Sequence, residues 1–85
     1  MSLLTALQNF FSPLPEGAVR YKGYIITATP EQAGSAYRIA GNISKNNKRA
    51  KFALADRVLG QANCVELAHR KGMIFIDQKG EALFS

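Results

Sequence analysis

The spacing of apolar residues changes along this chain, from a repeat of two to a repeat of about 3.6. From Ala36 to Ser44 apolar and polar residues alternate, which is typical of a β-strand. From about Gly60 to Lys79 the apolar residues instead share one broad arc of a helix. A chain of 85 residues is too short for two domains that each bury a core, so both patterns must share one. We therefore predict a single α+β domain.

Two further segments have the composition of strands. Val19–Thr29 is rich in aromatic and β-branched residues, which suit a pleated surface. Ala50–Ala55 places Phe52 and Leu54 on one side and Lys51 on the other. Together with Ala36–Ser44, these segments predict three strands.

The connections between these strands are short. Pro30–Gly34 is predicted to be a turn, and Lys45–Arg49 a hairpin tip, because asparagine tolerates the positive φ of tight hairpins. Short connections favour antiparallel neighbours. The predicted fold is a three-stranded antiparallel sheet packed against one long C-terminal helix, in the order β-β-β-α over residues 18–85.

Small residues form a stripe along the predicted helix. Cys64, Ala68 and Gly72 are four residues apart, so they lie on one side of it. Such a stripe allows another backbone to approach, and we expect the sheet to be this neighbour, with a partner helix as the alternative. Gly80 is suited to end the helix, and Leu83 and Phe84 are expected to fold back after it.

The first seventeen residues are set apart from the domain. Two prolines in the segment 12–17 predict a linker, and the preceding apolar residues have helical spacing, which predicts a short amphipathic helix. This helix could dock on the domain, contact another copy or another protein, or lie on a membrane. Its polar face carries no Lys or Arg, which argues against the membrane. The candidate partner-binding residues are Leu4, Leu7 and Phe11.

Positive charge is concentrated in one part of the chain. The formal net charge is +5, yet the segment from Arg20 to Lys51 holds seven basic residues and a single acid, Glu31. Phosphate binding needs such a cluster, and a two-stranded ribbon can enter the major groove of DNA. A solvated surface that discourages edge-to-edge pairing is the alternative. The candidate residues for binding DNA or RNA are Arg38, Lys45, Lys48, Arg49 and Lys51, with tyrosines 21, 24 and 37 on neighbouring strands.

Residues suited to catalysis or metal binding are few. The only histidine, His69, is expected at the surface, and the only cysteine, Cys64, is expected to be a buried, inert thiol. Glu66 and Asp77 are too far apart along the helix to act as a pair, so we expect solvated charges. No phosphate-binding loop or nucleophile motif is found. We expect a protein that is not an enzyme and has no metal, cofactor or small-molecule substrate.

The chain also lacks the marks of export. It has no apolar run close to the roughly 20 residues that cross a bilayer, and its start lacks the charged residues and cleavage site of a secretory signal. A lone cysteine agrees with a reducing compartment. We expect a cytoplasmic protein.

Five short stretches of the sequence resemble the HlyU transcriptional-activator family, a group of small bacterial proteins. They span about three quarters of the chain and comprise Tyr21–Tyr24, Ala28–Pro30, Tyr37–Ile43, Phe52–Arg57 and Gly80–Phe84.

The resemblance implies a cytoplasmic bacterial protein linked to transcription, but it marks no catalytic residue. The family's early helix tends to be acidic, whereas Gln61, Ala62 and Asn63 are neutral. One long helix after the strands is also not the helical pair of a helix-turn-helix reader. Two hypotheses follow. In the first, the basic hairpin contacts nucleic acid; in the second, the chain is a protein-interaction module or homodimer that uses its N-terminal helix and an exposed sheet edge.

Overall fold

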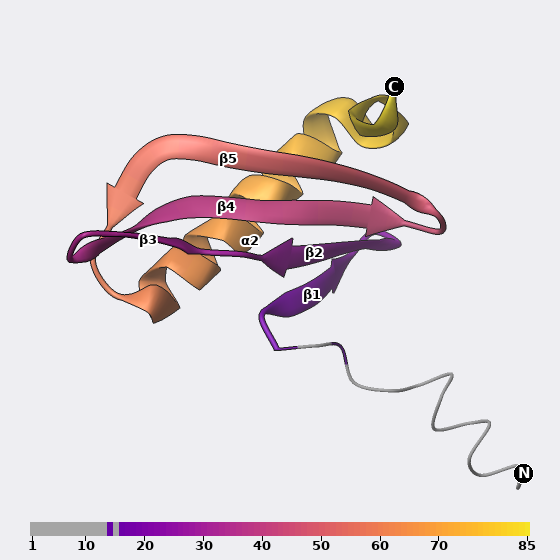
Figure 1. Ribbon diagram of the computed structural model, residues 1–85. Coiled ribbons are helices and arrows are strands. Elements are labelled where there is room, and N and C mark those ends of the chain that lie inside the picture. The colour runs from indigo at the N-terminus through magenta and orange to yellow at the C-terminus, as the bar shows by residue number, and fades with distance from the viewer. Residues whose placement is uncertain (1–13, 15) are drawn as a thin grey trace, which may run out of the picture.

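The computed structural model describes residue 14 and residues 16–85. In this part of the chain one antiparallel sheet of five strands is crossed on one face by a long helix (Figure 1). The elements are β1 (Ala18–Tyr21), β2 (Tyr24–Ala28), β3 (Glu31–Ala33), β4 (Ala36–Lys45), β5 (Lys48–Val58), α2 (Gln61–Lys79) and the 3-10 helix η1 (Gly80–Phe84).

Strand β4 is the centre of the sheet. On one side its second half pairs with β2 and its first half pairs with β3, so these two short strands follow one another along the same edge. β1 lies outside β2. On the other side β4 pairs with β5 along nearly its whole length, and β5 forms the sheet edge within the described residues (Figure 1).

The prediction of a three-stranded sheet is wrong, because the described sheet has five strands. The segment Val19–Thr29, predicted to be one strand, forms most of β1 and β2, and the predicted turn Pro30–Gly34 contains β3. Lys22 and Gly23 have φ values of 51° and 85°, so the chain reverses between β1 and β2. A two-residue turn with both φ positive matches the twist of the strands that it joins. β3 was missed because its three residues become a strand only by pairing with the start of β4.

The other predicted elements are present, although the strand predicted at Ala50–Ala55 is longer at both ends, because β5 runs from Lys48 to Val58. A strand was predicted from Ala36 to Ser44, and a helix was predicted from about Gly60 to Lys79; the structure has both within a residue or so. The hairpin tip was also predicted correctly, with Asn46 at a φ of 57°. The predicted N-terminal helix lies outside the described residues, together with Leu4, Leu7 and Phe11.

The stripe of small residues on α2 packs against the sheet, as predicted. Cys64, Ala68, Gly72 and Ile76 are the buried residues of this helix. Their neighbours are the alternate residues of β2 and β4 that point to the same side, such as Ile26 and Ile43, which are almost fully buried. The core therefore lies between α2 and one face of the sheet.

The chain turns sharply where α2 ends. Gly80 has a φ of 53°, and its backbone N–H donates to the carbonyl of Ile76. η1 then returns Leu83 and Phe84 to the core, as predicted, and Phe84 stacks on Tyr24 with 6.2 Å between ring centroids. No helix in residues 16–85 is long and apolar enough to cross a bilayer.

Candidate nucleic-acid interface

The sheet has two faces with different surroundings. Successive residues of a strand point to opposite faces, and residues directly opposite one another in a ladder share a face. Ile26 and Ile43 are paired and buried under α2. Their neighbours Ile25 and Ser44, which are also paired, therefore point away from the helix. We call this second face, which no described element covers, the open face.

The strand registers arrange the open face in rows. Arg20 pairs with Ile25, Ile25 with Ser44, and Ser44 with Arg49. Arg20 and Arg49 therefore end the same row on opposite edges of the sheet, roughly 14 Å apart at three strand spacings. The next row runs from Ala18 through Thr27 and Asn42 to Lys51.

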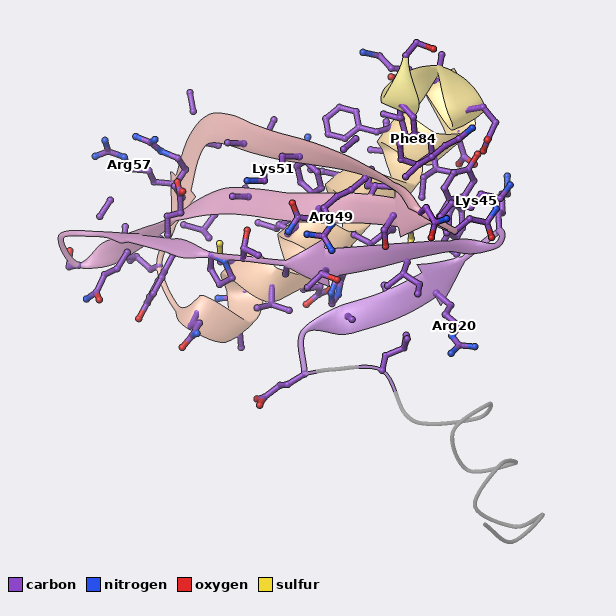
Figure 2. The ribbon with its side chains drawn as sticks, turned by 45° about the vertical axis from the view of Figure 1, so that its right-hand side comes forward. Arg20, Lys45, Arg49, Lys51, Arg57 and Phe84 are labelled. Atoms are coloured by element: carbon purple, nitrogen blue, oxygen red, sulfur yellow. The ribbon has the colours of Figure 1, made fainter. Side chains whose placement is uncertain are left out.

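A further row lies toward the other end of the sheet. Arg38 of β4 is directly opposite Arg57 of β5, beyond an irregularity in the register. On its other side Arg38 is opposite Glu31 of β3, and its Nη1 is 3.9 Å from Glu31 Oε1. In Figure 2 the labelled Arg57 lies at the opposite end of the sheet from Lys45.

Most cations of the open face have no acidic partner. All six Asp and Glu residues belong to the described part of the chain, and the ion pairs formed there use other bases except at Arg38. The basic residues of the open face that make no ion pair are Arg20, Arg49, Lys51 and Arg57 (Figure 2). Their charge is available to an outside partner.

The five basic residues predicted from the sequence do not share a face. Arg38, Arg49 and Lys51 belong to the open face. Lys45 and Lys48 form the last pair of the β4–β5 ladder and point to the helix side. Their Nζ atoms are 3.4 Å and 3.5 Å from the Glu81 carboxylate of η1.

Glu81 joins the hairpin tip to the C-terminal segment. The Tyr24 hydroxyl donates a hydrogen bond of 2.7 Å to its carboxylate, and Lys45 Nζ is 4.7 Å from the centre of the Tyr24 ring. The hydrogen bond from Tyr24, and then the lysines, hold the pKa of Glu81 below its usual value. Lys45 and Lys48 therefore have a partner within the protein.

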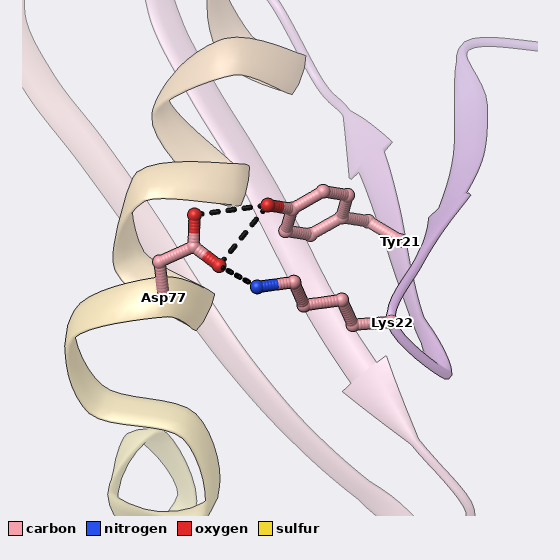
Figure 3. Close-up of polar contacts among 3 residues, drawn as sticks. All are labelled: Tyr21, Lys22 and Asp77. Carbon is pink, nitrogen blue, oxygen red and sulfur yellow. Dashed lines mark hydrogen bonds and ion pairs between the residues drawn. The ribbon is translucent and has the colours of Figure 1, made fainter.

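A second carboxylate makes a similar contact on the helix side. The Tyr21 hydroxyl donates to both oxygens of Asp77, and Lys22 Nζ donates to one of them at 2.7 Å (Figure 3). The hydrogen bond from Lys22, followed by that from Tyr21, lowers the pKa of Asp77. Asp77 was predicted to be a solvated charge, but it ties the β1–β2 turn to α2.

The tyrosines also belong to the helix side. Tyr21 and Tyr24 contact the C-terminal part of the chain, and Tyr37 packs on the core around Cys64. The open face of the described sheet therefore presents no tyrosine for stacking on a base. Apart from Ile25, which lies between Arg20 and Ser44, its cations are separated by small and short polar residues, such as Ala53, Thr27 and Asn42.

Two basic residues of the open face were missed by the sequence analysis. Arg20 was counted in the basic segment but not placed with the hairpin, and Arg57 lies beyond that segment. The alternation of each strand could have suggested the side to which they point. Nothing local shows that Arg20 shares a row with Arg49, because their register passes through β2 and β4.

His69 and Cys64 have structural contacts. His69 was expected at the surface but is half-buried, and its Nε2–H donates to the carbonyl of Gly17 at 2.7 Å. Cys64 is fully buried, as predicted, and its thiol donates to the carbonyl of Arg38. Burial raises the pKa of Cys64. No group of three potential metal ligands occurs within the described residues.

Comparison with known proteins gives one match. A family model described as "Transcriptional activator HlyU" matches residues 2–84, nearly the whole chain. No match was found among curated proteins or among solved structures.

Proposed function

Because this chain belongs to the HlyU family of transcriptional activators, we propose that it acts in transcription by binding the phosphate backbone of DNA through its open face. The observation that carries this proposal is a set of four cations on that face that make no ion pair within residues 16–85, namely Arg20, Arg49, Lys51 and Arg57. In this proposal the protein is a non-catalytic regulator in the cytoplasm, where a bacterial chromosome is located.

The chemistry of the open face favours duplex phosphates over single-stranded bases. Proteins that bind single strands combine cations with aromatic rings on which bases stack. The tyrosines here are used on the helix side instead. Arginine and lysine contacts to phosphate are insensitive to sequence, so we expect modest affinity that falls steeply with salt. Contact with about four phosphates predicts a slope of log K against log salt of about −3 to −4.

Two pairs of substitutions with the same charge test the proposal. Arg49→Ala/Lys51→Ala removes two cations from the open face, whereas Lys45→Ala/Lys48→Ala removes two from the helix side of the same hairpin. Binding to a fluorescent DNA duplex is measured at several salt concentrations. We expect the first variant to lose affinity and to lower the magnitude of the salt slope by about two units. The second variant should stay close to the parent protein.

The controls separate the effect of the open face from the effect of the net charge of the protein. Circular dichroism of each variant verifies that it is folded. Equal loss of affinity in both variants would mean that net charge, and not the open face, attracts the duplex. Absence of binding at low salt and high micromolar protein would show that the open face is only a solvated surface.

A protein-interaction function is the second candidate, and the free edge of β5 favours it. β5 has 11 residues and pairs only with β4 among the described strands, so one row of backbone groups is available to another strand. Such a complex would survive high salt, unlike one with DNA. Sedimentation of the parent protein in low and high salt distinguishes the two candidate functions. That Leu7 and Phe11 contribute to a protein complex stays a prediction, which the same measurement on variants of these residues tests.

A further inference from the structure

We propose that Arg38 and Arg57 form a binding site for a phosphoryl group. This site adds detail to the proposed function. It rests on that function in one respect, namely that a DNA backbone is the natural source of the phosphoryl group. A small phosphorylated molecule is the other source of the same chemistry.

The first argument is the placement of the two arginines. They are directly opposite in the β4–β5 ladder and share the open face. Like charges at directly opposite positions destabilise a sheet. An anion between the two guanidinium groups would turn this repulsion into attraction.

The second argument is that the guanidinium group of Arg38 is only partly paired within the protein. Its Nε atom is buried and has no hydrogen-bond partner within the described residues. Glu31 is its ion-pair partner, but the contact is long at 3.9 Å, and both side chains are partly exposed. One carboxylate also cannot neutralise two arginines. The pair therefore keeps a net positive charge, and the buried Nε–H of Arg38 lacks an acceptor among the described residues.

The third argument is the space beside the pair. In the next row Ala40 is opposite Ala53, so two small side chains form the floor of a shallow hollow of about 500 Å³. Thr29, Asn42 and Lys51 also line it, together with Glu31, the ion-pair partner of Arg38. Lys51 lines this hollow, and the row of Arg38 and Arg57 lies next to it, roughly 13 Å from the row of Lys51 along β4.

These features suit a phosphoryl group better than a carboxylate. A guanidinium group offers planar, paired donors that match two oxygens of a phosphate. A phosphoryl group has enough acceptor oxygens to bind both arginines and also a hydroxyl or ammonium donor from the hollow. A carboxylate has only two oxygens, and Glu31 already presents one to Arg38. Binding of the phosphoryl group would displace Glu31.

Inorganic phosphate is the direct probe of the site. The Nε–H signals of the arginines are followed by ¹⁵N NMR as phosphate is added to the full chain, with chloride at equal ionic strength as the reference. We expect a saturable shift of the signals of Arg38 and Arg57, while that of Arg70, which pairs with Glu66 on α2, stays unchanged. Shifts that grow linearly and equally at all arginines would overturn the proposal.

Two conservative substitutions test the geometry. Glu31→Gln removes the competing carboxylate and should tighten phosphate binding by about two- to fivefold, the range for release of one exposed ion pair. Glu66→Gln is the matched control, because it removes the same charge from another exposed ion pair with arginine, and it should have no effect. Arg57→Lys keeps the charge but loses the paired donors, and should weaken binding at least about fivefold.

The same variants with duplex DNA separate this site from the proposed function. If Glu31→Gln tightens and Arg57→Lys weakens both phosphate and duplex binding, the DNA backbone is the ligand. If they change phosphate binding while no duplex binds, the anion site holds, its ligand is a small phosphorylated molecule, and the proposed function fails. If the duplex binds through Arg49 and Lys51 but phosphate does not saturate, the proposed function holds and the Arg38–Arg57 site is rejected.

Discussion

Gly72 of α2 lies so close to Ile26 of β2 that a β-carbon on Gly72 would be 2.7 Å from Ile26 Cγ2. Ile26 is fully buried, so its side chain has little room to move. This contact explains why a glycine, a poor helix former, stands in the middle of α2. The close approach of helix and sheet depends on it.

Gly72→Leu should therefore destabilise the protein by about 1–3 kcal/mol, although leucine has the better helix propensity. Urea unfolding of the variant and the parent measures the difference. In an Ile26→Ala background, Gly72→Ala should instead be neutral or stabilising, because the obstructing side chain is gone. A stable Gly72→Leu variant would show that α2 does not pack on β2 at this point.

Gly41 of β4 makes the corresponding contact within the sheet. A β-carbon on Gly41 would be 2.8 Å from the carbonyl oxygen of Thr27 and 2.8 Å from Phe52 Cζ. We expect Gly41→Ala to cost about 1–3 kcal/mol of unfolding free energy. Phe52→Leu should rescue it only in part, since the Thr27 oxygen belongs to the backbone. Complete rescue in urea unfolding would assign the whole effect to Phe52.

Cys64 should resist thiol reagents in the native protein and react rapidly in urea. It is fully buried, and burial raises its pKa, so both access and the thiolate form are disfavoured. The chain has no second cysteine, so the rate of colour release from a disulfide reagent reports this thiol alone. Fast stoichiometric labelling under native conditions would contradict its place in the core.

Stability should decrease in acid as Glu81 and Asp77 become protonated. Their partners hold the pKa of both carboxyls below the usual values. A lowered pKa in the folded state stabilises the protein above the pKa of the unfolded chain, and this contribution is lost as pH falls through the folded value. The loss should begin below about pH 4 to 5.

Melting temperatures of the parent and of Glu81→Gln between neutral pH and pH 3 measure this effect. The variant should melt lower at neutral pH, because it has lost the charged partner of Lys45 and Lys48. The difference should shrink as the pH falls, since the parent then loses the same charge. A difference that is independent of pH would mean that the carboxylate charge contributes nothing.

Patterns within single elements predicted part of this fold. The alternation in β4 and the helical period of α2 placed both elements almost to the residue, and the helix orientation followed from Cys64, Ala68 and Gly72. The break between β1 and β2 was missed because Lys22 is not a residue that usually adopts a positive φ. β3 was missed because its three residues form a strand only through their partners on β4.

Charge shows the same division between local and long-range information. The sequence alone was sufficient to find an excess of positive charge between Arg20 and Lys51 and to predict a hairpin tip within that segment. It could not show that neighbours such as Lys48 and Arg49 have different surroundings, one beside Glu81 and the other on the open face. Those surroundings depend on which face α2 covers and on registers between strands distant in the sequence. Only tertiary packing therefore brings Arg20 into the row of Arg49, and Arg57 beside Arg38.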